Sequence, residues 1–270
     1  MVIDSAKGKS LMLSIREVGL SISGISLLNN ISFDCPRGTI TALMGPNGAG
    51  KTSLLNIISG EHQATQGRVL INNRLSDEWK IADIAQFMSV LPQSSSLEFS
   101  FTAQEVVALG RIPHATGLVR DAEIVSAALN RVDACYLAER SFMQLSGGEK
   151  QRVQLARVLA QIWEYCEREC IADGILLLDE PSTSFDLEHQ LMLIETVKQI
   201  AARGVTVVMV MHDLNMAAKC ADQLVMINCG ECTAVGTVNK LLTPALIEKV
   251  FSVNVEVIKH PVDGTPLVVM

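Results

Sequence analysis

The sequence lacks any apolar run that approaches the ~18 residues of a membrane span, although 49% of its 270 residues are hydrophobic. It also lacks an export signal, because Lys7 and Lys9 are not followed by an apolar core with a cleavage site. We therefore expect a cytosolic chain that does not cross a bilayer by itself. A chain of this length can bury a sizeable core without disulfide bonds.

Blocks of basic residues are also missing, and the formal net charge is −7. A nucleic acid recognised through its phosphates is therefore not an expected partner. Any anionic ligand must be met by a local group of donors, not by a broad basic surface.

The seven cysteines are an odd number in a chain without an export signal, which favours free thiols over a disulfide framework. Two pairs invite a metal interpretation, Cys229 with Cys232 and Cys166 with Cys170. No histidine lies at ligand spacing from either pair. We interpret the first pair as part of a turn between strands and the second as one face of a helix.

Against these absences stands one strong motif, residues 45–52, which reads GPNGAGKT and fits G-x-x-x-x-G-K-[ST]. The apolar segment 38–44 before it predicts a buried strand, and the apolar spacing in 51–59 predicts a helix. Glycines between a strand and a helix let backbone N–H groups converge on an anion, and the helix N-terminus adds its dipole. The segment therefore predicts a site for a nucleoside triphosphate.

Three side chains at the start of this helix have expected roles. Lys51 reaches the β- and γ-phosphates, Thr52 places its hydroxyl on Mg²⁺, and Ser53 reaches another phosphate oxygen. The expected nucleotide-binding residues are Gly45, Pro46, Asn47, Gly48, Ala49, Gly50, Lys51, Thr52 and Ser53.

The rest of the chain alternates strands and helices, which predicts an α/β fold. Short runs separated by turn residues predict antiparallel strands over 11–44, and 68–71 is a further strand. Helical spacing returns over 102–140 and 147–167. Continuous apolar runs predict buried parallel strands at 175–178, 205–210 and 224–227.

The first of these buried runs ends in two acids, Asp179 and Glu180. Ligands of open α/β sheets bind at the carboxyl ends of the strands. There Asp179 is placed to hold Mg²⁺ through water, and Glu180 to polarise the water that attacks the γ-phosphate.

A second loop leads into a helix at 145–152, LSGGEKQR, where a serine and two glycines expose N–H groups. One chain with two phosphate-binding helix ends suggests that each nucleotide is sandwiched, with one end supplied by a partner subunit.

With these motifs the sequence resembles the ATP-binding-cassette (ABC) ATPases over about 11–240. The resemblance implies a P-loop NTPase fold of the ABC type, with a mixed β core, antiparallel N-terminal strands and an α-helical subdomain at about 95–160. Residues 241–270 are then a short tail and not a separate regulatory domain. The motifs follow the family's order: loop 45–52, Gln93, signature 145–149, acidic strand 175–180, dimer loop 183–186 and His212.

The resemblance also implies roles. Glu180, His212 and Gln93 are catalytic, and Mg²⁺ is held by Thr52, Gln93 and Asp179. The ATP bound by the other subunit of a homodimer is contacted by Ser146, Gly147, Gly148, Glu149 and Asp186.

Two positions depart from the family pattern. The aromatic residue that stacks on adenine is missing, because Ser23 and Gly24 stand there and no aromatic residue precedes Ile31. Weak selectivity for the base is therefore expected. In the signature, Glu149 replaces glutamine, a common exchange.

Segment 102–114 is similar to that of metal-chelate importers, and 161–174 and 260–267 look most like haem importers. The resemblance then implies an ATPase subunit on the cytoplasmic face of the bacterial inner membrane. Its partners are permease subunits and, indirectly, a periplasmic binding protein. Alternatives are a siderophore or cobalamin importer, a soluble ABC ATPase such as an iron-sulfur assembly factor, and, more remotely, a metabolite kinase.

In the family a permease helix docks beside segment 102–114. Phe99 and Phe101 are the expected anchors, and Arg111 is expected at the rim. Val107 and Leu109 fit either this surface or the core.

Overall fold

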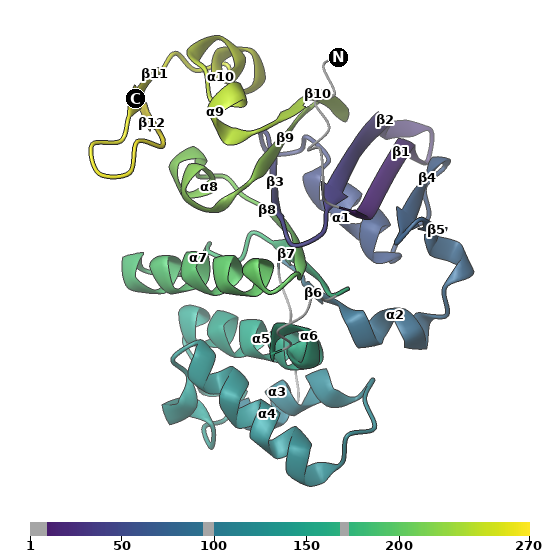
Figure 1. Ribbon diagram of the computed structural model, residues 1–270, viewed down its shortest axis with the longest axis vertical. Coiled ribbons are helices and arrows are strands. Elements are labelled where there is room, and N and C mark those ends of the chain that lie inside the picture. The colour runs from purple at the N-terminus through teal and green to yellow at the C-terminus, as the bar shows by residue number, and fades with distance from the viewer. Residues whose placement is uncertain (1–9, 94–99, 168–172) are drawn as a thin grey trace. The chain divides into compact units, whose positions relative to one another are not determined.

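The computed structural model describes residues 10–93, 100–167 and 173–270 (Figure 1). The chain divides into two compact units, residues 1–79 with 206–270, and residues 80–205. The expected anchor Phe99 and the cysteine Cys170 lie outside the described residues.

The first unit contains an antiparallel sheet with the strand order β2-β1-β4-β5 (Figure 1). Its strands are β1 (Leu11–Ile22), β2 (Ile25–Pro36), β4 (Gln66–Ile71) and β5 (Arg74–Leu75). Ile15 lies opposite Phe33 on one side and Val69 on the other, and all three side chains are buried. This cross-strand packing of apolar side chains holds the sheet together. The antiparallel N-terminal strands expected from the sequence are confirmed.

The tight turn between β1 and β2 is made by Ser23 and Gly24, both with positive φ of 51° and 80°. Such a two-residue turn matches the twist of the strands that it joins. It places Ile22 directly opposite Ile25 at the end of the hairpin, where both side chains are exposed.

A second group of strands in this unit has the order β10-β9-β3-β8. They are β3 (Ile40–Met44), β8 (Thr206–Val210), β9 (Gln223–Asn228) and β10 (Glu231–Gly236). β3 pairs in parallel with both β8 and β9, and every residue of β3 and β8 is buried. Burial on both faces explains why these strands are continuous apolar runs in the sequence.

The remaining elements of the first unit are one 3-10 turn, four helices and a hairpin within its described residues. They are η1 (Ser76–Glu78), α1 (Lys51–Ser59), α8 (Leu214–Cys220), α9 (Val238–Leu241), α10 (Pro244–Phe251), β11 (Glu256–Lys259) and β12 (Pro266–Val269).

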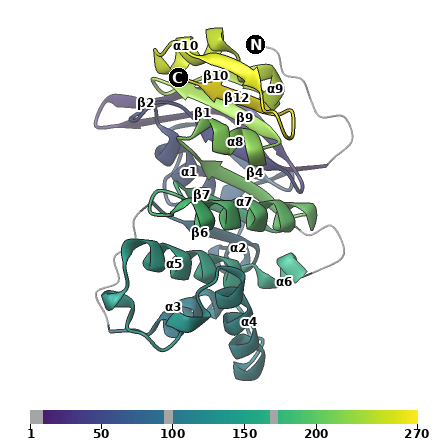
Figure 2. The same cartoon turned by 90° about the vertical axis from the view of Figure 1, so that its left-hand side faces the viewer.

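The second unit holds the parallel pair β6 (Met88–Leu91) and β7 (Ile175–Asp179) together with most of the helices. These are α2 (Ile81–Phe87), α3 (Ala103–Ala108), α4 (Leu118–Arg131), α5 (Gly147–Gln161), α6 (Trp163–Glu167) and α7 (Leu187–Ala202), with η2 (Leu109–Arg111), η3 (Cys135–Leu137) and η4 (Phe142–Gln144). Figure 2 shows α5 beside α3 and α4, which pack on it.

This helical packing is close. A Cβ atom on Gly110 would lie 2.3 Å from the carbonyl oxygen of Arg157 on α5, so only glycine fits there. The helix expected over 147–167 is divided instead into α5 and α6, because Ile162 leaves the helical conformation with φ −109° and ψ 22°. Within the described residues, no helix has both the length and the apolar character that crossing a lipid bilayer requires.

Candidate functional site: two phosphate-binding helix ends

The phosphate loop joins β3 to α1, as the sequence predicts, since β3 ends at Met44 and α1 begins at Lys51. Gly48 and Gly50 have φ values of 76° and 99°, which residues with a Cβ atom rarely adopt. A Cβ atom on Gly50 would also lie 2.6 Å from Cδ2 of Leu28. Backbone conformation and packing therefore both require glycine at position 50.

The side chain of Lys51 is 5% exposed and folds back over the loop. Its Nζ donates hydrogen bonds to the carbonyl oxygens of Gly45 at 2.8 Å and Pro46 at 2.9 Å. A buried ammonium group thus lies beside backbone N–H groups at a helix N-terminus, an arrangement suited to a polyphosphate. The neighbouring Thr52 is exposed.

The turn between β9 and β10, which the sequence analysis did not assign to this site, supports the phosphate loop through Gly230. The N–H of Gly230 donates to the carbonyl oxygen of Ala49 at 3.1 Å, and the N–H of Asn29 donates to the carbonyl oxygen of Gly230 at 2.8 Å. Gly230 has a φ of 76°, and a Cβ atom there would lie 2.5 Å from the carbonyl oxygen of Leu27. The sequence indicates a turn at Cys229 and Gly230, but no local pattern indicates that this turn contacts the phosphate loop.

His212 lies at the same edge of the sheet as the phosphate loop. β8 runs parallel to β3, and the N–H of Met211 donates to the carbonyl oxygen of Leu43 at 3.2 Å. His212 follows and is exposed. The structure therefore brings together the phosphate loop and the expected switch histidine within the first unit.

The second unit brings together another part of the expected site. Leu91 of β6 pairs with Leu178 of β7, so the exposed Gln93 and the two acids end neighbouring parallel strands. Asp179 is 2% exposed, and Glu180 has a left-handed φ of 48°. That conformation costs a residue with a Cβ roughly 1–2 kcal/mol, and such strain is frequent at functional sites.

The signature segment is organised by a capping box at the start of α5. The N–H of Ser146 donates to Oε2 of Glu149 at 2.8 Å, and the N–H of Glu149 donates to Oγ of Ser146 at 3.3 Å. The hydrogen bonds from Ser146 hold the pKa of the Glu149 carboxyl group below its usual value. Glutamate in place of the signature glutamine thus serves the helix end directly.

The two signature glycines differ in their surroundings. A Cβ atom on Gly148 would lie 2.9 Å from the carbonyl oxygen of Ser184, whereas one on Gly147 would meet nothing closer than 3.8 Å. The signature therefore packs against loop 183–186. Asp186 ends that loop, and its Oδ1 accepts hydrogen bonds from the N–H of His189 at 3.0 Å and from its ring Nδ1 at 2.7 Å.

The hydrogen bonds from His189 hold the pKa of the Asp186 carboxyl group below its usual value. A charged, oriented carboxylate therefore stands beside the signature segment. Together these contacts give the second unit a capped helix N-terminus that packs against loop 183–186.

Each unit offers an oxygen of the kind that Mg²⁺ takes together with phosphate oxygens. In the first unit it is the hydroxyl of Thr52, and in the second the carboxylate of Asp179.

The expected docking residues take several positions. Arg111 was expected at a rim and is buried, at 4% exposed, because its guanidinium pairs with Asp121 at 2.9 Å and Glu164 at 2.5 Å. That expectation was wrong. Val107 is fully buried, and the carbonyl of the half-buried Phe101 accepts a hydrogen bond from the backbone of Phe142.

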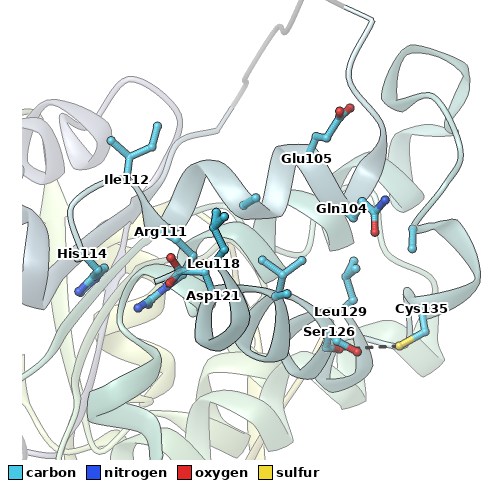
Figure 3. Close-up of a pocket in the computed structure, with 14 residues that line it drawn as sticks. Gln104, Glu105, Arg111, Ile112, His114, Leu118, Asp121, Ser126, Leu129 and Cys135 are labelled. Atoms are coloured by element: carbon cyan, nitrogen blue, oxygen red, sulfur yellow. Dashed lines mark hydrogen bonds and ion pairs between the residues drawn. The ribbon is translucent and has the colours of Figure 1, made fainter. Parts of the chain in front are cut away.

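A groove of about 630 Å³ lies between α3 and α4 in the second unit (Figure 3). Ala108, Val125 and Leu129 contribute apolar surface. Ile112 and Leu118 also line it and are 74% and 90% exposed. Gln104, Glu105 and Cys135 lie toward the opposite end from His114 (Figure 3).

Taken together, the loop with its buried lysine and the strand that ends in two acids define a P-loop nucleoside triphosphatase. The sequence profile described as ABC transporter matches residues 28–183. The chain therefore belongs to the ABC transporter family, and it is an ATP-hydrolysing subunit of that family.

Among similar proteins, the hemin import ATP-binding protein HmuV of Pseudomonas fluorescens is 43% identical over 258 residues, which cover 96% of this chain and 99% of that protein. The protein of the same name from Gloeobacter violaceus is 43% identical over 260 residues, covering 96% and 94%.

Among solved structures, an inward-facing transporter described as of the metal-chelate ABC type matches with a TM-score of 0.78 and 25% identity, over 96% of both chains. A nucleotide-free ATP-binding cassette, at 21% identity and a TM-score of 0.71, covers 90% of this chain and 96% of that one and shares the fold.

Proposed function

We propose that this chain powers a bacterial importer of an iron chelate, and that the chelate is haem. The observation that carries the proposal is the identity of 43% across nearly the whole chain to a protein named for hemin import. Two chains bind two ATP molecules with Mg²⁺, each between the phosphate loop of one chain and the signature of the other.

The dimer is supported by the two phosphate-binding ends on one chain. Lys51 has a buried ammonium group at one end. Ser146 and Gly148 form the other end, with Gly147, Glu149 and Asp186 beside them. A nucleotide held by both ends is stabilised by two helix dipoles, so ATP favours dimerisation.

Hydrolysis then uses three residues. Glu180 orients and polarises the attacking water, His212 donates a hydrogen bond to the γ-phosphate, and Gln93 senses Mg²⁺ and the same water. Thr52, Gln93 and Asp179 would hold Mg²⁺. These roles fit the positions of Glu180, His212 and Gln93, each of which follows the carboxyl end of a strand, β7, β8 and β6 respectively.

The partner is a pair of permease subunits, which the chain meets at the cytoplasmic face of the inner membrane. A cytoplasmic helix of each permease subunit occupies the groove between α3 and α4, to which the exposed Ile112 and Leu118 offer apolar contacts. Glu105 lines the same groove and favours a helix that carries a basic residue near it. A periplasmic binding protein acts indirectly, by delivering the chelate to the permease.

In this proposal the ATPase domain spans residues 11–240, with the helical subdomain at about 95–160, and 241–270 form a short tail. A siderophore or cobalamin cargo is the first alternative, since cargo is recognised by the other subunits. A soluble ABC ATPase, such as an iron-sulfur assembly factor, is the second.

One experiment separates these possibilities. The chain is purified with the permease encoded beside its gene and reconstituted in vesicles, and ATP-driven uptake of haem, a ferric siderophore and cobalamin is compared. We expect uptake of haem alone. Uptake of a ferric siderophore or cobalamin instead would show that the cargo is that chelate and not haem. Failure of the chain to purify with a permease would favour the soluble ATPase.

A further inference from the structure

The side chain of Asn215 on α8 pairs with the backbone of the C-terminal hairpin of β11 and β12. Its Nδ2 donates to the carbonyl oxygen of Val268 at 3.0 Å, and its Oδ1 accepts from the N–H of Val268 at 2.7 Å. The side chain thus satisfies both backbone groups of one residue 53 positions away. Both ends of the amide are used, so its plane is fixed.

The pairing of β11 with β12 does not use the N–H and carbonyl groups of Val268. Within β11 and β12, Val268 lies opposite Val257, and the N–H of His260 donates to the carbonyl oxygen of Thr265 at 2.8 Å. Hydrogen-bonded pairs alternate along an antiparallel ladder, so counting from that pair makes Val257 and Val268 a non-hydrogen-bonded pair. The polar groups of Val268 therefore face away from β11, toward Asn215.

Asn215 belongs to the first turn of α8 and lies three residues after His212. Asp213 caps this helix, and its Oδ1 accepts from the N–H groups of Asn215 at 2.8 Å and Met216 at 3.0 Å. Only residues 211–213 separate the end of β8 from the start of α8. A link of three residues is short, so a shift of α8 moves His212 with it.

Apolar packing on the core also supports this segment. The side chains of Met216, Ala217 and Ala218 are buried, which fixes the distance of α8 from the sheet. Apolar packing is not directional, whereas two hydrogen bonds to one backbone residue are. The pairing of Asn215 with Val268 thus sets how α8 is rotated and where it sits along its own axis.

We propose that Asn215 is a positioning residue for His212, and that the C-terminal hairpin is its anchor. The hairpin holds α8 through Asn215, and α8 holds the His212 imidazole where it meets the γ-phosphate. This inference rests on the proposed role of His212 in hydrolysis. It gives the tail a part in the reaction that neither its distance in sequence nor its composition indicates.

Two substitutions break the pairing from opposite sides. Asn215→Leu removes both hydrogen bonds with a side chain of similar size. Val268→Pro removes the N–H that faces Asn215 without removing a hydrogen bond of the ladder to β11, which does not use that N–H. Asn215→Asp keeps the oxygen that accepts from Val268 and sets the other oxygen against the carbonyl, so it is the conservative variant. Asn254→Leu, at an exposed asparagine of the same unit, is the control.

We expect Asn215→Leu and Val268→Pro each to lower the kcat of ATP hydrolysis by about ten-fold, since small misplacements of a reacting group are costly. The KM for ATP should stay within about two-fold, because the phosphate loop is untouched. Asn215→Asp should give an intermediate kcat, and Asn254→Leu the kcat of the unchanged protein. A Tm well above the assay temperature separates this result from unfolding.

His212→Ala shows whether the effect passes through the histidine. We expect His212→Ala to lower kcat strongly, and Asn215→Leu to add nothing in that background. Unchanged kcat in both Asn215→Leu and Val268→Pro would overturn the inference, as would an equal loss in the His212→Ala background. Normal kcat in His212→Ala alone would instead overturn the proposed role of His212. If Asn215→Leu does not fold, Val268→Pro carries the same test.

Discussion

The ammonium group of Lys51 donates to the carbonyl oxygen of Gly45 at 2.8 Å, so the lysine of the phosphate loop reaches back to the loop's first residue. A second hydrogen bond to Pro46 keeps the group there. A triphosphate presents charged oxygen atoms to the same ammonium group, and charge-assisted hydrogen bonds are stronger than those to neutral carbonyls. We therefore expect nucleotide binding to exchange the acceptors around a charge that is already in place.

Replacing Lys51 with alanine should abolish tight ATP binding while the fold persists, because the charge that offsets the β- and γ-phosphates is lost. Titration with a fluorescent ATP analogue measures the affinity, and circular dichroism checks the fold. Lys198→Ala, at an exposed position on α7, is the control and should bind ATP normally. Unchanged affinity in Lys51→Ala would exclude this loop as the phosphate site.

The neighbouring glycines of the signature offer a matched pair. Gly148→Ala places a Cβ atom 2.9 Å from the carbonyl oxygen of Ser184, so it should lower the free energy of unfolding by about 1–3 kcal/mol. Gly147→Ala meets nothing closer than 3.8 Å and should leave stability unchanged or raise it slightly, since alanine favours helix. Urea unfolding of both variants gives the comparison. Equal stability would mean that loop 183–186 does not pack on the signature as described.

Sequence and structure agree best where function dictates local backbone geometry. The helix after the phosphate loop begins at Lys51 and ends at Ser59 as expected, and the acidic strand ends at Asp179. Glycine spacing and apolar runs act within a few residues, so the sequence shows them directly. The antiparallel N-terminal strands and the buried parallel strands could be predicted for the same reason.

What could not be predicted depends on partners far apart in the chain. Arg111 is buried because Glu164, 53 residues away, neutralises it, and no periodic pattern shows such a pair. The pairing of Asn215 with Val268 and the support of Ala49 by Gly230 are of the same kind. Each is a hydrogen bond set by tertiary packing, which overrides what local sequence favours.

The nucleotide base should be selected weakly. The turn at Ser23 carries no aromatic side chain, and the exposed pair of Ile22 and Ile25 offers only apolar surface, which does not distinguish adenine from guanine. GTP should compete nearly as well as ATP. Ile25→Tyr should tighten binding of both nucleotides, because stacking on a base is worth ~1–3 kcal/mol. A strong preference for ATP in the unchanged protein would mean that another side chain reads the base.

The docking groove can be tested without touching the nucleotide site. Replacing both Ile112 and Leu118 with glutamate should leave ATP binding intact but weaken co-purification with the permease, because charges replace the apolar contacts. Ile81→Glu, at a position 87% exposed outside the groove, is the control. Normal assembly of the double variant would place the docking surface elsewhere.

The two phenylalanines expected from the sequence to anchor the permease helix, Phe99 and Phe101, allow a second test of the docking surface. Phe99→Ser with Phe101→Ser should also leave ATP binding intact, weaken assembly and uncouple hydrolysis from transport. Because Phe101 is half-buried, the Tm of the double variant is measured as well, to separate weak assembly from unfolding. Normal transport by this variant would remove both residues from the docking surface.

The most direct measurement of the central claim is the mass of Glu180→Gln with ATP and Mg²⁺. An amide can neither polarise nor deprotonate the attacking water as a carboxylate does, so this variant should bind ATP without hydrolysing it. The ATP-bound dimer then accumulates, and size exclusion with light scattering should show twice the mass of the chain only when ATP and Mg²⁺ are present. Glu195→Gln, at an exposed position on α7, should hydrolyse ATP normally and show no such dimer. Normal hydrolysis by Glu180→Gln, or a mass that ATP does not change, would contradict the account.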